Sequence, residues 1–362
     1  MFYYFLYPLR EQWFVFNLFK YITFRSVGAS ITAFLVCLIL GPAVTRWLKI
    51  LSAVGSTERE HAAQIHALYK DKKSVPTMGG ILIIIGIVSA SLLWGNLTSR
   101  LLLISVATLI WFGMIGFVDD YLKVKRKSSR GLRSMGKLAG QVAWGAALGW
   151  YLYHDPEFYG SLYVPFLKDA VIYLGVFYIP FVILVLAGSS NALNLTDGLD
   201  GLAIGCLIFA AGAFSIISYA SGHVVFAEYL RIPYFAESGE LTVFCSAMVG
   251  AGAGFLWYNS YPATIFMGDT GSLSLGGALG AVAVCIKKEL VLLIVGGIFV
   301  WEALSVIIQV ASFKLRGKRV FLMSPFHHHL QLKGWPESKV TIRLWIVAFV
   351  LALIGLSTLK IR

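Results

Sequence analysis

The amino-acid sequence predicts an all-α, polytopic integral membrane protein with about ten transmembrane helices. Of its 362 residues, 58% are hydrophobic and only 13% are charged, and the mean hydropathy is +0.77. A soluble domain carries about 25% charged residues and a disordered chain is more polar still, so the composition excludes both classes. The hydrophobic residues, roughly 210 in number, are enough for about ten helices of ~20 residues each.

Stretches with few charged residues divide the chain into the predicted spans. The longer windows must include parts of loops, and the polar segments 191–196 and 257–268 are the clearest of these. Glu302 interrupts one window, where it is either a buried structural carboxylate or a residue that lines a lipid groove. The windows are 26–45, 74–99, 101–118, 138–154, 170–196, 201–227, 241–268, 270–286, 290–313 and 344–359.

Basic residues set the predicted orientation. Ten spans place both termini on one side of the membrane and five connecting loops on the other, and these loops hold 20 of the 30 Lys and Arg residues. The positive-inside rule makes the loops cytoplasmic and both termini periplasmic. Part of the net charge of +12 then follows from topology, and it predicts no nucleic-acid partner. We expect one transmembrane domain, residues 1–362, with an active site formed by the loops at about 46–73, 119–137, 188–200, 257–269 and 314–343.

Aspartates gather at the cytoplasmic ends of the predicted spans. Asp119 and Asp120 end one span and Lys123 follows them. Two adjacent carboxylates at a helix C-terminus are unfavourable unless a cation lies beside them, and Mg²⁺ is commonly held by one or two carboxylates together with phosphate oxygens. Asp269 precedes Thr270 at the start of another helix, which also suits a metal or a phosphate.

Amides and carboxylates recur in the loop before the span at 201–227. Asn191, Asn194, Asp197 and Asp200 follow one another at intervals of three residues, with glycines after both aspartates. Glycines favour a loop that opens into a helix N-terminus, where free N–H groups bind phosphate. The pattern therefore indicates a phosphate or metal site rather than a plain polar turn.

Other polar residues extend the predicted cleft. Asn259 and Phe266 lie in the turn at 257–269, and Phe266 is suited to stack on a planar base. Lys72, beside Thr77, and Lys137 open two further spans, where basic side chains can clamp an anionic substrate. Phe266 also has an ordinary interpretation as packing at the membrane interface. Lys72 and Lys137 can equally be charges that set the topology or bind lipid headgroups.

Three consecutive histidines, His327, His328 and His329, lie in the last basic loop. Zinc is one interpretation, but adjacent histidines rarely reach a single ion, and imidazoles that face phosphates fit the surrounding Lys and Arg better. With the aspartates, they predict phosphoryl transfer, in which catalysis is mostly positioning and charge neutralisation. The membrane location implies that one substrate is a lipid.

These motifs resemble the polyprenyl-phosphate sugar-1-phosphate transferases, from about residue 22 to the end of the chain. The Asp119-Asp120 pair and the run Asn194-x-x-Asp197-Gly-x-Asp200-Gly-Leu resemble the whole family. The segments 76–80 (Pro-Thr-Met-Gly-Gly) and 325–330 (Pro-Phe-His-His-His-Leu) resemble its muramoyl-pentapeptide branch. Val75 departs from the pattern, which has Thr before the proline.

The resemblance implies a reaction and a location. Phospho-N-acetylmuramoyl-pentapeptide would pass from its UDP carrier to undecaprenyl phosphate, with Mg²⁺, to give lipid I and UMP in the first membrane step of peptidoglycan synthesis. The enzyme would lie in the bacterial cytoplasmic (inner) membrane with its active site on the cytoplasmic face. The resemblance also implies a homodimer, and the small residues Gly276, Gly277 and Gly280 favour close approach of helices.

The same resemblance implies roles for single residues. Asp269 would be the principal metal ligand, and Asp119 would act as the base or orient the lipid phosphate, with Asp120 in support. His328 would be the leading phosphate-facing histidine. The remaining expected substrate-binding residues are Lys72, Thr77, Lys123, Lys137, Asn191, Asn194, Asp197, Asp200, Asn259, Phe266, His327 and His329.

Two other functions remain open from sequence. One is a transferase of UDP-N-acetylhexosamine to a polyprenyl phosphate for another envelope polymer, which the three histidines disfavour. The other is a transporter, although transporter charges usually lie near the bilayer midplane in broken helices. Within the expected reaction, direct attack by the lipid phosphate and a covalent phosphoryl-enzyme are both open, and we favour direct attack.

Overall fold

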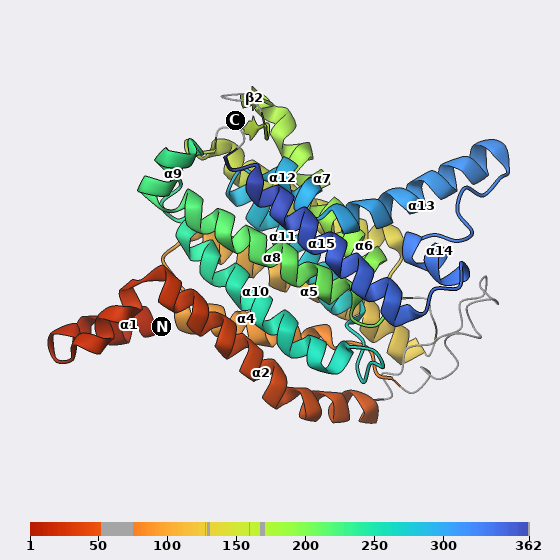
Figure 1. The fold of residues 1–362 in the computed structure, drawn as a ribbon, viewed down its shortest axis with the longest axis horizontal. Helices are drawn as coiled ribbons and strands as arrows, with labels where there is room; N and C mark the ends of the chain where they lie inside the picture. The colour runs from red at the N-terminus through yellow and green to blue at the C-terminus, as the bar shows by residue number, and fades with distance from the viewer. Residues whose placement is uncertain (52–74, 127, 129–130, 159, 167–170, 361–362) are drawn as a thin grey trace.

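The computed structural model describes residues 1–51, 75–126, 128, 131–158, 160–166 and 171–360. Within them, a bundle of helices forms the body of the molecule (Figure 1). The principal helices are α2 (Ile22–Ile50), α4 (Gly80–Trp94), α5 (Arg100–Arg126), α6 (Ser134–His154), α7 (Tyr178–Thr196), α8 (Leu202–Ser221), α10 (Ser238–Asn259), α11 (Gly268–Cys285), α13 (Gly297–Arg316) and α15 (Glu337–Ser357). The short elements are α1 (Phe2–Leu6), η1 (Tyr7–Glu11), η2 (Phe14–Lys20), β1 (Ser161–Tyr163), β2 (Val171–Tyr173), η4 (Gly175–Phe177), α9 (Val224–Leu230), α12 (Glu289–Val295) and α14 (Phe326–Leu332).

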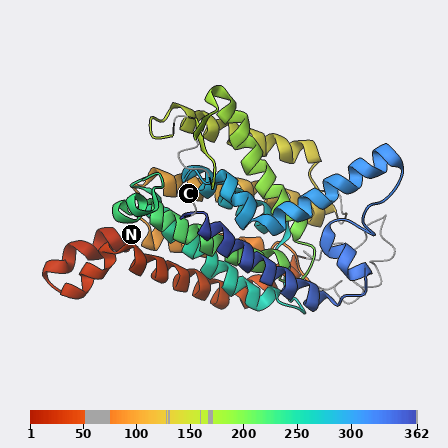
Figure 2. The same cartoon turned by 45° about the horizontal axis from the view of Figure 1, so that its top comes forward.

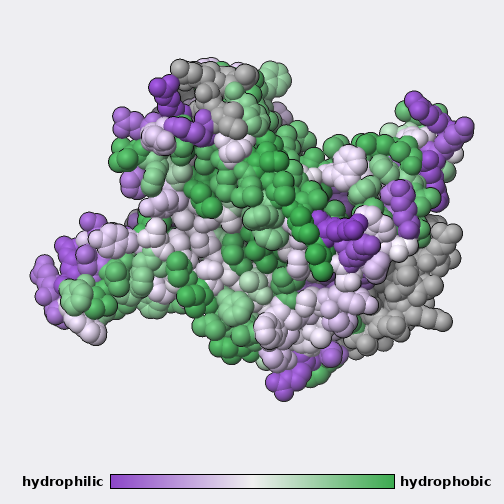
Figure 3. All heavy atoms as spheres, viewed as in Figure 1, coloured by the Kyte–Doolittle hydropathy of each residue, from purple (hydrophilic) through white to green (hydrophobic). Residues whose placement is uncertain are grey.

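The helices confirm a polytopic, all-α membrane protein. Every predicted apolar window contains a helix, and seven helices in the described residues are long and apolar enough to cross a membrane. Figure 3 shows hydrophobic residues over the middle of the bundle and hydrophilic residues gathered toward its ends. The exact number of spans and the orientation of the termini stay predictions.

Three features depart from the prediction. The polar segment 191–196, expected to be part of a loop, forms the C-terminal end of α7, because the chain has no helix breaker between residue 191 and Gly198. The window 290–313 holds two helices, α12 and α13, because the chain is interrupted at Gly296 and Gly297, which have low helix propensity. In addition, β1 and β2 form a small antiparallel hairpin in which Leu162 lies opposite Ile172. Strands of three residues are too short to produce a recognisable alternation of apolar and polar side chains.

Helix α11 lies at the centre of the bundle. All its residues from Thr270 to Cys285 are buried, and it packs against α5 and α7. A Cβ atom at Gly276 would lie 2.5 Å from the carbonyl oxygen of Ser189, and one at Gly277 would lie 2.7 Å from the Phe112 ring. These small residues therefore allow close packing inside the chain and do not form a surface for a second copy.

The polar loops and the chain termini lie at opposite ends of the bundle (Figures 1 and 2). At the terminal end, Arg25 forms a buried ion pair of 2.6 Å with Glu240, at the start of α10. Lys360 there donates to the carbonyl oxygen of Tyr229, 3.2 Å away. At the other end, the loop that follows α10 pairs with residues 76–80, and this is where the predicted aspartates lie.

Candidate active site

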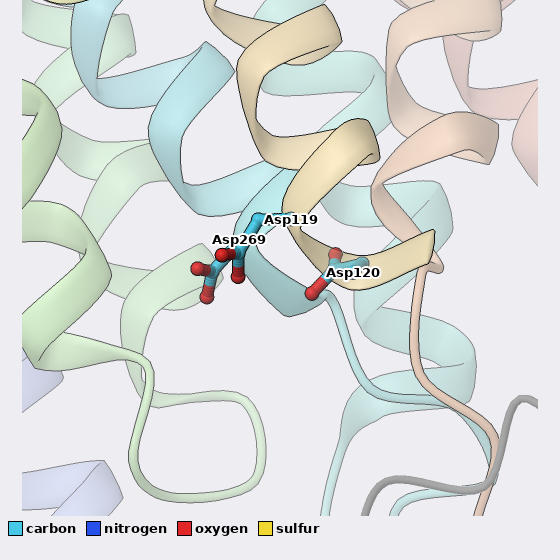
Figure 4. Close-up of side chains that lie close together, drawn as sticks. All are labelled: Asp119, Asp120 and Asp269. Carbon is cyan, nitrogen blue, oxygen red and sulfur yellow. The ribbon is translucent and has the colours of Figure 1, made fainter. Parts of the chain in front are cut away.

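The crossing of α5 and α11 brings three aspartates together. Gly116 on α5 lies so close to α11 that a Cβ atom there would be 2.2 Å from the carbonyl oxygen of Asp269. One turn further along α5, Asp119 and Asp120 reach the start of α11 and Asp269 (Figure 4). One carboxylate oxygen from each residue lies within 4.8 Å of the other two.

Two lysines partly balance the charge of this acidic cluster. Lys123, one turn beyond Asp119 on α5, places its Nζ 2.5 Å from Asp119 Oδ2 and 3.2 Å from Asp269 Oδ2. Lys137, near the start of α6, places its Nζ 2.5 Å from Asp269 Oδ2 and 3.0 Å from Asp119 Oδ2. Both ammonium groups therefore contact the same pair of carboxylates from different helices.

The three carboxylates have different surroundings. Asp120 accepts hydrogen bonds from the backbone N–H (2.9 Å) and the hydroxyl (2.8 Å) of Thr270, which fix it against the first turn of α11. Asp119 accepts from the backbone N–H of Leu132 at 2.7 Å, and its other oxygen faces the lysines. The Asp269 side chain is 16% exposed, against 1% and 3% for the other two, so it is the most accessible carboxylate.

The two asparagines of α7 have separate partners. Asn194 donates to Asp269 Oδ1 at 3.0 Å and to the Ser272 hydroxyl at 2.7 Å, which places it at the edge of the aspartate cluster. Asn191, one turn away, donates to Gln141 Oε1 at 2.8 Å on α6. The structure therefore brings Asn194 to the cluster and uses Asn191 to link α7 to α6.

Asp197 follows α7 and lies in the same acidic surroundings. Burial and the nearby charges of Asp269 and Asp120 raise the pKa of the Asp197 carboxyl to about 7. The chain then turns through Gly201, whose φ of 74° is left-handed and suits glycine, before α8 begins. A bound cation would stabilise the ionised form of Asp197 in this position.

Two residues that we expected to bind substrate hold loops together. Asn259 accepts from the backbone N–H of Gly201 (3.1 Å) and donates to the carbonyl oxygen of Ile265 (2.9 Å). Asp200 accepts from the backbone N–H of Ala263 at 3.0 Å. Both side chains are 3% exposed. They join the loop after α7 to the loop after α10, so their visible role is to shape the site.

The segment that leads into α4 pairs with the loop before α11. Phe266 N–H donates to the carbonyl oxygen of Pro76, and Gly79 N–H donates to that of Phe266, both at 2.8 Å. Next to this pairing, the Thr77 hydroxyl lies beside Gly268, and the ring of Phe266 is half-buried at the edge of the site. The pairing places the start of α11, and with it Asp269, against α5. Lys72 lies outside the described residues.

The three histidines lie on α14 and face different partners. The buried His327 ring lies against Gly198, where a Cβ atom would be 2.2 Å from Nε2. His328 is also buried, and its Nδ1 lies 2.9 Å from Gln331 Oε1. His329 accepts from the backbone N–H of Leu322 at 3.1 Å. His327 therefore borders the Asp197 loop, His328 packs against His327, and His329 holds the segment before α14.

Several residues that the structure places at the site have no role predicted from the sequence. They are Thr270 and Ser272, which bond the site residues Asp120 and Asn194, and Glu337, whose carboxylate accepts from the Asp200 N–H at 2.8 Å. Thr270 and Ser272 flank Gly271 directly after Asp269, and this proximity in sequence was the available signal. No feature of the sequence indicates a role for Glu337, because its partner Asp200 is more than a hundred residues away in the chain.

The carboxylates fit a divalent cation. Mg²⁺ is typically bound through one or two carboxylates, and its other ligands are water and substrate phosphates. Asp119 and Asp269 offer such a pair, and the two lysine ammonium groups balance only part of the charge of the three carboxylates. Lysines next to the carboxylates are also suited to hold phosphate groups. Fold and site together define a membrane-bound enzyme of phosphoryl transfer.

Comparison with known proteins identifies the family. Residues 101–287 match the model of glycosyl transferase family 4. The chain is 49% identical over 363 residues to a phospho-N-acetylmuramoyl-pentapeptide-transferase of Desulfotalea psychrophila and 52% identical over 362 residues to that of Pelobacter propionicus, each alignment covering 100% of both chains. It is 53% identical to the Granulibacter bethesdensis enzyme over 98% of both. The chain therefore belongs to glycosyl transferase family 4 and, within it, to the phospho-N-acetylmuramoyl-pentapeptide transferases.

Proposed function

We propose that this chain transfers phospho-N-acetylmuramoyl-pentapeptide from its UDP carrier to undecaprenyl phosphate and so forms lipid I and UMP, the first membrane step of peptidoglycan synthesis. Full-length identity of about half to transferases of that name supports the substrate pair. One structural observation carries the chemistry: Asp119, Asp120 and Asp269 meet beside two lysines at one end of an apolar bundle.

The site has the properties of a Mg²⁺-dependent transferase. A bound Mg²⁺ would reduce the repulsion between two anionic substrates and stabilise charge on the departing phosphate. Asp269, as the most accessible carboxylate, is the proposed principal ligand. Asp119 would orient the lipid phosphate or accept its proton. Asp120 would support both, because Thr270 already fixes its carboxylate.

The remaining polar residues would hold the nucleotide substrate. Lys123 and Lys137 would bind the diphosphate, and Asn194 would hold it at the edge of the cluster. Phe266, half-buried beside the cluster, would stack on the uracil ring. His328 and its neighbours on α14 would face the phosphates from the opposite side of the Asp197 loop.

We favour direct transfer without a covalent intermediate. The lipid phosphate is largely dianionic at neutral pH because its second pKa is about 6. One of its oxygens would form a bond to the β-phosphorus while the bond from that phosphorus to the oxygen of the α-phosphate breaks, and UMP departs. Trapping a phosphoryl-enzyme in the absence of lipid acceptor would overturn this preference.

The proposed topology follows from the positive-inside rule and from the relative positions of the loops. Ten spans in one transmembrane domain would place both termini in the periplasm and the aspartate cluster at the cytoplasmic face of the bacterial inner membrane. The common position of the two termini, opposite the cluster, supports an even number of crossings. We also propose a homodimer, through a surface other than the buried glycine stripe of α11.

The decisive experiment measures UMP release by purified protein in detergent. The mixture contains undecaprenyl phosphate, UDP-N-acetylmuramoyl-pentapeptide and Mg²⁺, with EDTA and lipid-free controls. Release that needs both the metal and the lipid is the expected result. Release only with UDP-N-acetylglucosamine would move the chain to a transferase for another envelope polymer, and no release with either sugar nucleotide from folded protein would overturn phosphoryl transfer.

A further inference from the structure

Glu302 is a buried carboxylate in the second turn of α13, a helix that is otherwise apolar over its first turns. Its side chain is 1% exposed, and it lies toward α14 rather than toward the aspartate cluster. A buried carboxylate is costly unless it is paired and accepts hydrogen bonds. The groups that donate to or pair with this carboxylate therefore indicate the role of Glu302.

Among the described residues, the hydrogen-bond and ion-pair partners of the Glu302 carboxylate belong to a single residue, His327. The backbone N–H of His327 points at both carboxylate oxygens, at 3.2 Å and 3.3 Å. The ring Nδ1 of the same residue lies 3.2 Å from Oε2. Glu302 thus accepts a hydrogen bond from an N–H group of the first turn of α14 and places its charge within ion-pair distance of one edge of the His327 ring, although Nδ1 makes no hydrogen bond there.

The other edge of that ring faces the nucleotide side of the site. His327 Nε2 lies against Gly198, directly after Asp197, and it has no hydrogen-bond partner among the described residues. The His327 ring also packs edge-on against His328, with ring centroids 4.2 Å apart. A displacement of His327 would therefore move the Asp197 loop and His328 together.

We propose that Glu302 is a positioning residue that sets His327, and through it His328 and the Asp197 loop, for binding of the anionic UDP-linked substrate. The inference rests on the proposed function of the site. Glu302 itself touches neither the aspartate cluster nor the proposed phosphate-binding lysines. Its effect on the reaction is transmitted by the histidine that it holds.

Helix α13 offers a matched control two turns further on. Gln309 accepts hydrogen bonds from the backbone N–H groups of Val320 (3.0 Å) and Phe321 (2.9 Å), in the segment that precedes α14. It therefore also ties this segment to α13, but it does not contact a histidine. Gln309→Ala reports the effect of loosening the segment without disturbing His327.

The experiment compares wild type, Glu302→Gln, Glu302→Ala and Gln309→Ala in the UMP-release assay, with separate titrations of each substrate. For Glu302→Ala we expect KM for the UDP-linked substrate to rise about tenfold or more, as for loss of hydrogen bonds to a charged group, with KM for the lipid unchanged. Glu302→Gln keeps an acceptor for the His327 N–H but not the charge beside Nδ1. Its KM for the UDP-linked substrate should therefore lie between those of wild type and Glu302→Ala. Gln309→Ala should resemble wild type.

A double-mutant cycle distinguishes positioning from a general structural role. If Glu302 acts through the histidines, Glu302→Ala should raise KM much less when His328→Ala is already present. Additive effects, equal increases in both KM values, or wild-type kinetics in Glu302→Ala or Glu302→Gln would each overturn the proposal. Calorimetry measures the affinity of each variant for the UDP-linked substrate, and so allows the same comparison among variants in the absence of turnover. Failure of the proposed function would appear separately, as inactive wild type and inactive Gln309→Ala.

Discussion

The contact between Gly116 and α11 makes the active site sensitive to a single methyl group. In Gly116→Ala, the new Cβ would lie 2.2 Å from the carbonyl oxygen of Asp269 and 2.6 Å from the Cα of Thr270. A comfortable carbon–oxygen contact is about 3.3 Å, so the start of α11 must retreat by about 1 Å. The clashing atoms belong to the backbone, and no side-chain rotation can relieve them.

This shift separates Asp269 from Asp119 and Asp120, because those residues follow Gly116 by less than two turns on α5. A misplacement of about 1 Å at a reacting centre costs on the order of 100-fold in rate, equivalent to about 2.7 kcal/mol in the activation barrier. The added methyl group should also lower stability by roughly 1–3 kcal/mol through overpacking. We therefore expect kcat to fall about 100-fold in protein that still inserts and folds.

The assay is UMP release, with thermal unfolding measured on the same preparations. Gly212→Ala on α8 is the matched control, because no atom lies within 4 Å of its added Cβ. An alanine in that helix should be neutral or stabilising by about 0.5–1 kcal/mol. If folded Gly116→Ala turned over as fast as this control, the argument that α5–α11 contact sets the site geometry would be refuted.

Three further predictions concern charged residues. Asp269→Ala should abolish turnover while the protein still inserts and folds, because it removes the most accessible carboxylate; residual turnover near the wild-type rate would contradict this. Lys137→Ala should raise KM for the UDP-linked substrate about tenfold, through loss of a charge-assisted contact to phosphate, and an unchanged KM would count against its place in the cleft. At the other end of the bundle, burial lowers the pKa of Lys287 to about 8 from 10.5. Between these values the unfolded chain binds more protons than the native one, so the Tm of wild type should rise with pH relative to Lys287→Met, and parallel curves would refute this.

The sequence predicted the helices well because their signal is local. An apolar window needs only its own residues to identify it, and each window contains a helix in the structure. The division of 290–313 into α12 and α13 was missed, because apolar side chains continue on both sides of Gly296 and Gly297. The β1–β2 hairpin was missed because three residues do not establish a period.

The structure brings together part of the set of predicted site residues, but the sequence did not give their contacts. Asp119, Asp269 and Asn194 do lie together, because short polar motifs at the same end of a helical bundle are necessarily close in space. The sequence could not show which side chains face the cleft. Asp200 and Asn259 have the residue types of ligands, but the structure uses them to join two loops.

The Pro76–Gly80 motif shows why this distinction matters for function. From the sequence, the basic residues beside this motif suggest that it binds an anionic substrate. In the structure, the backbone of the motif pairs with Phe266 and Met267, just before Asp269. Gly80 packs directly on Gly271, so that a Cβ atom would lie 2.1 Å from the Gly271 nitrogen. Two close approaches, this one from α4 and that of Gly116 from α5, therefore fix the position of the start of α11. The side chains supply the charge for phosphoryl transfer, and the glycines fix the distances over which that charge acts.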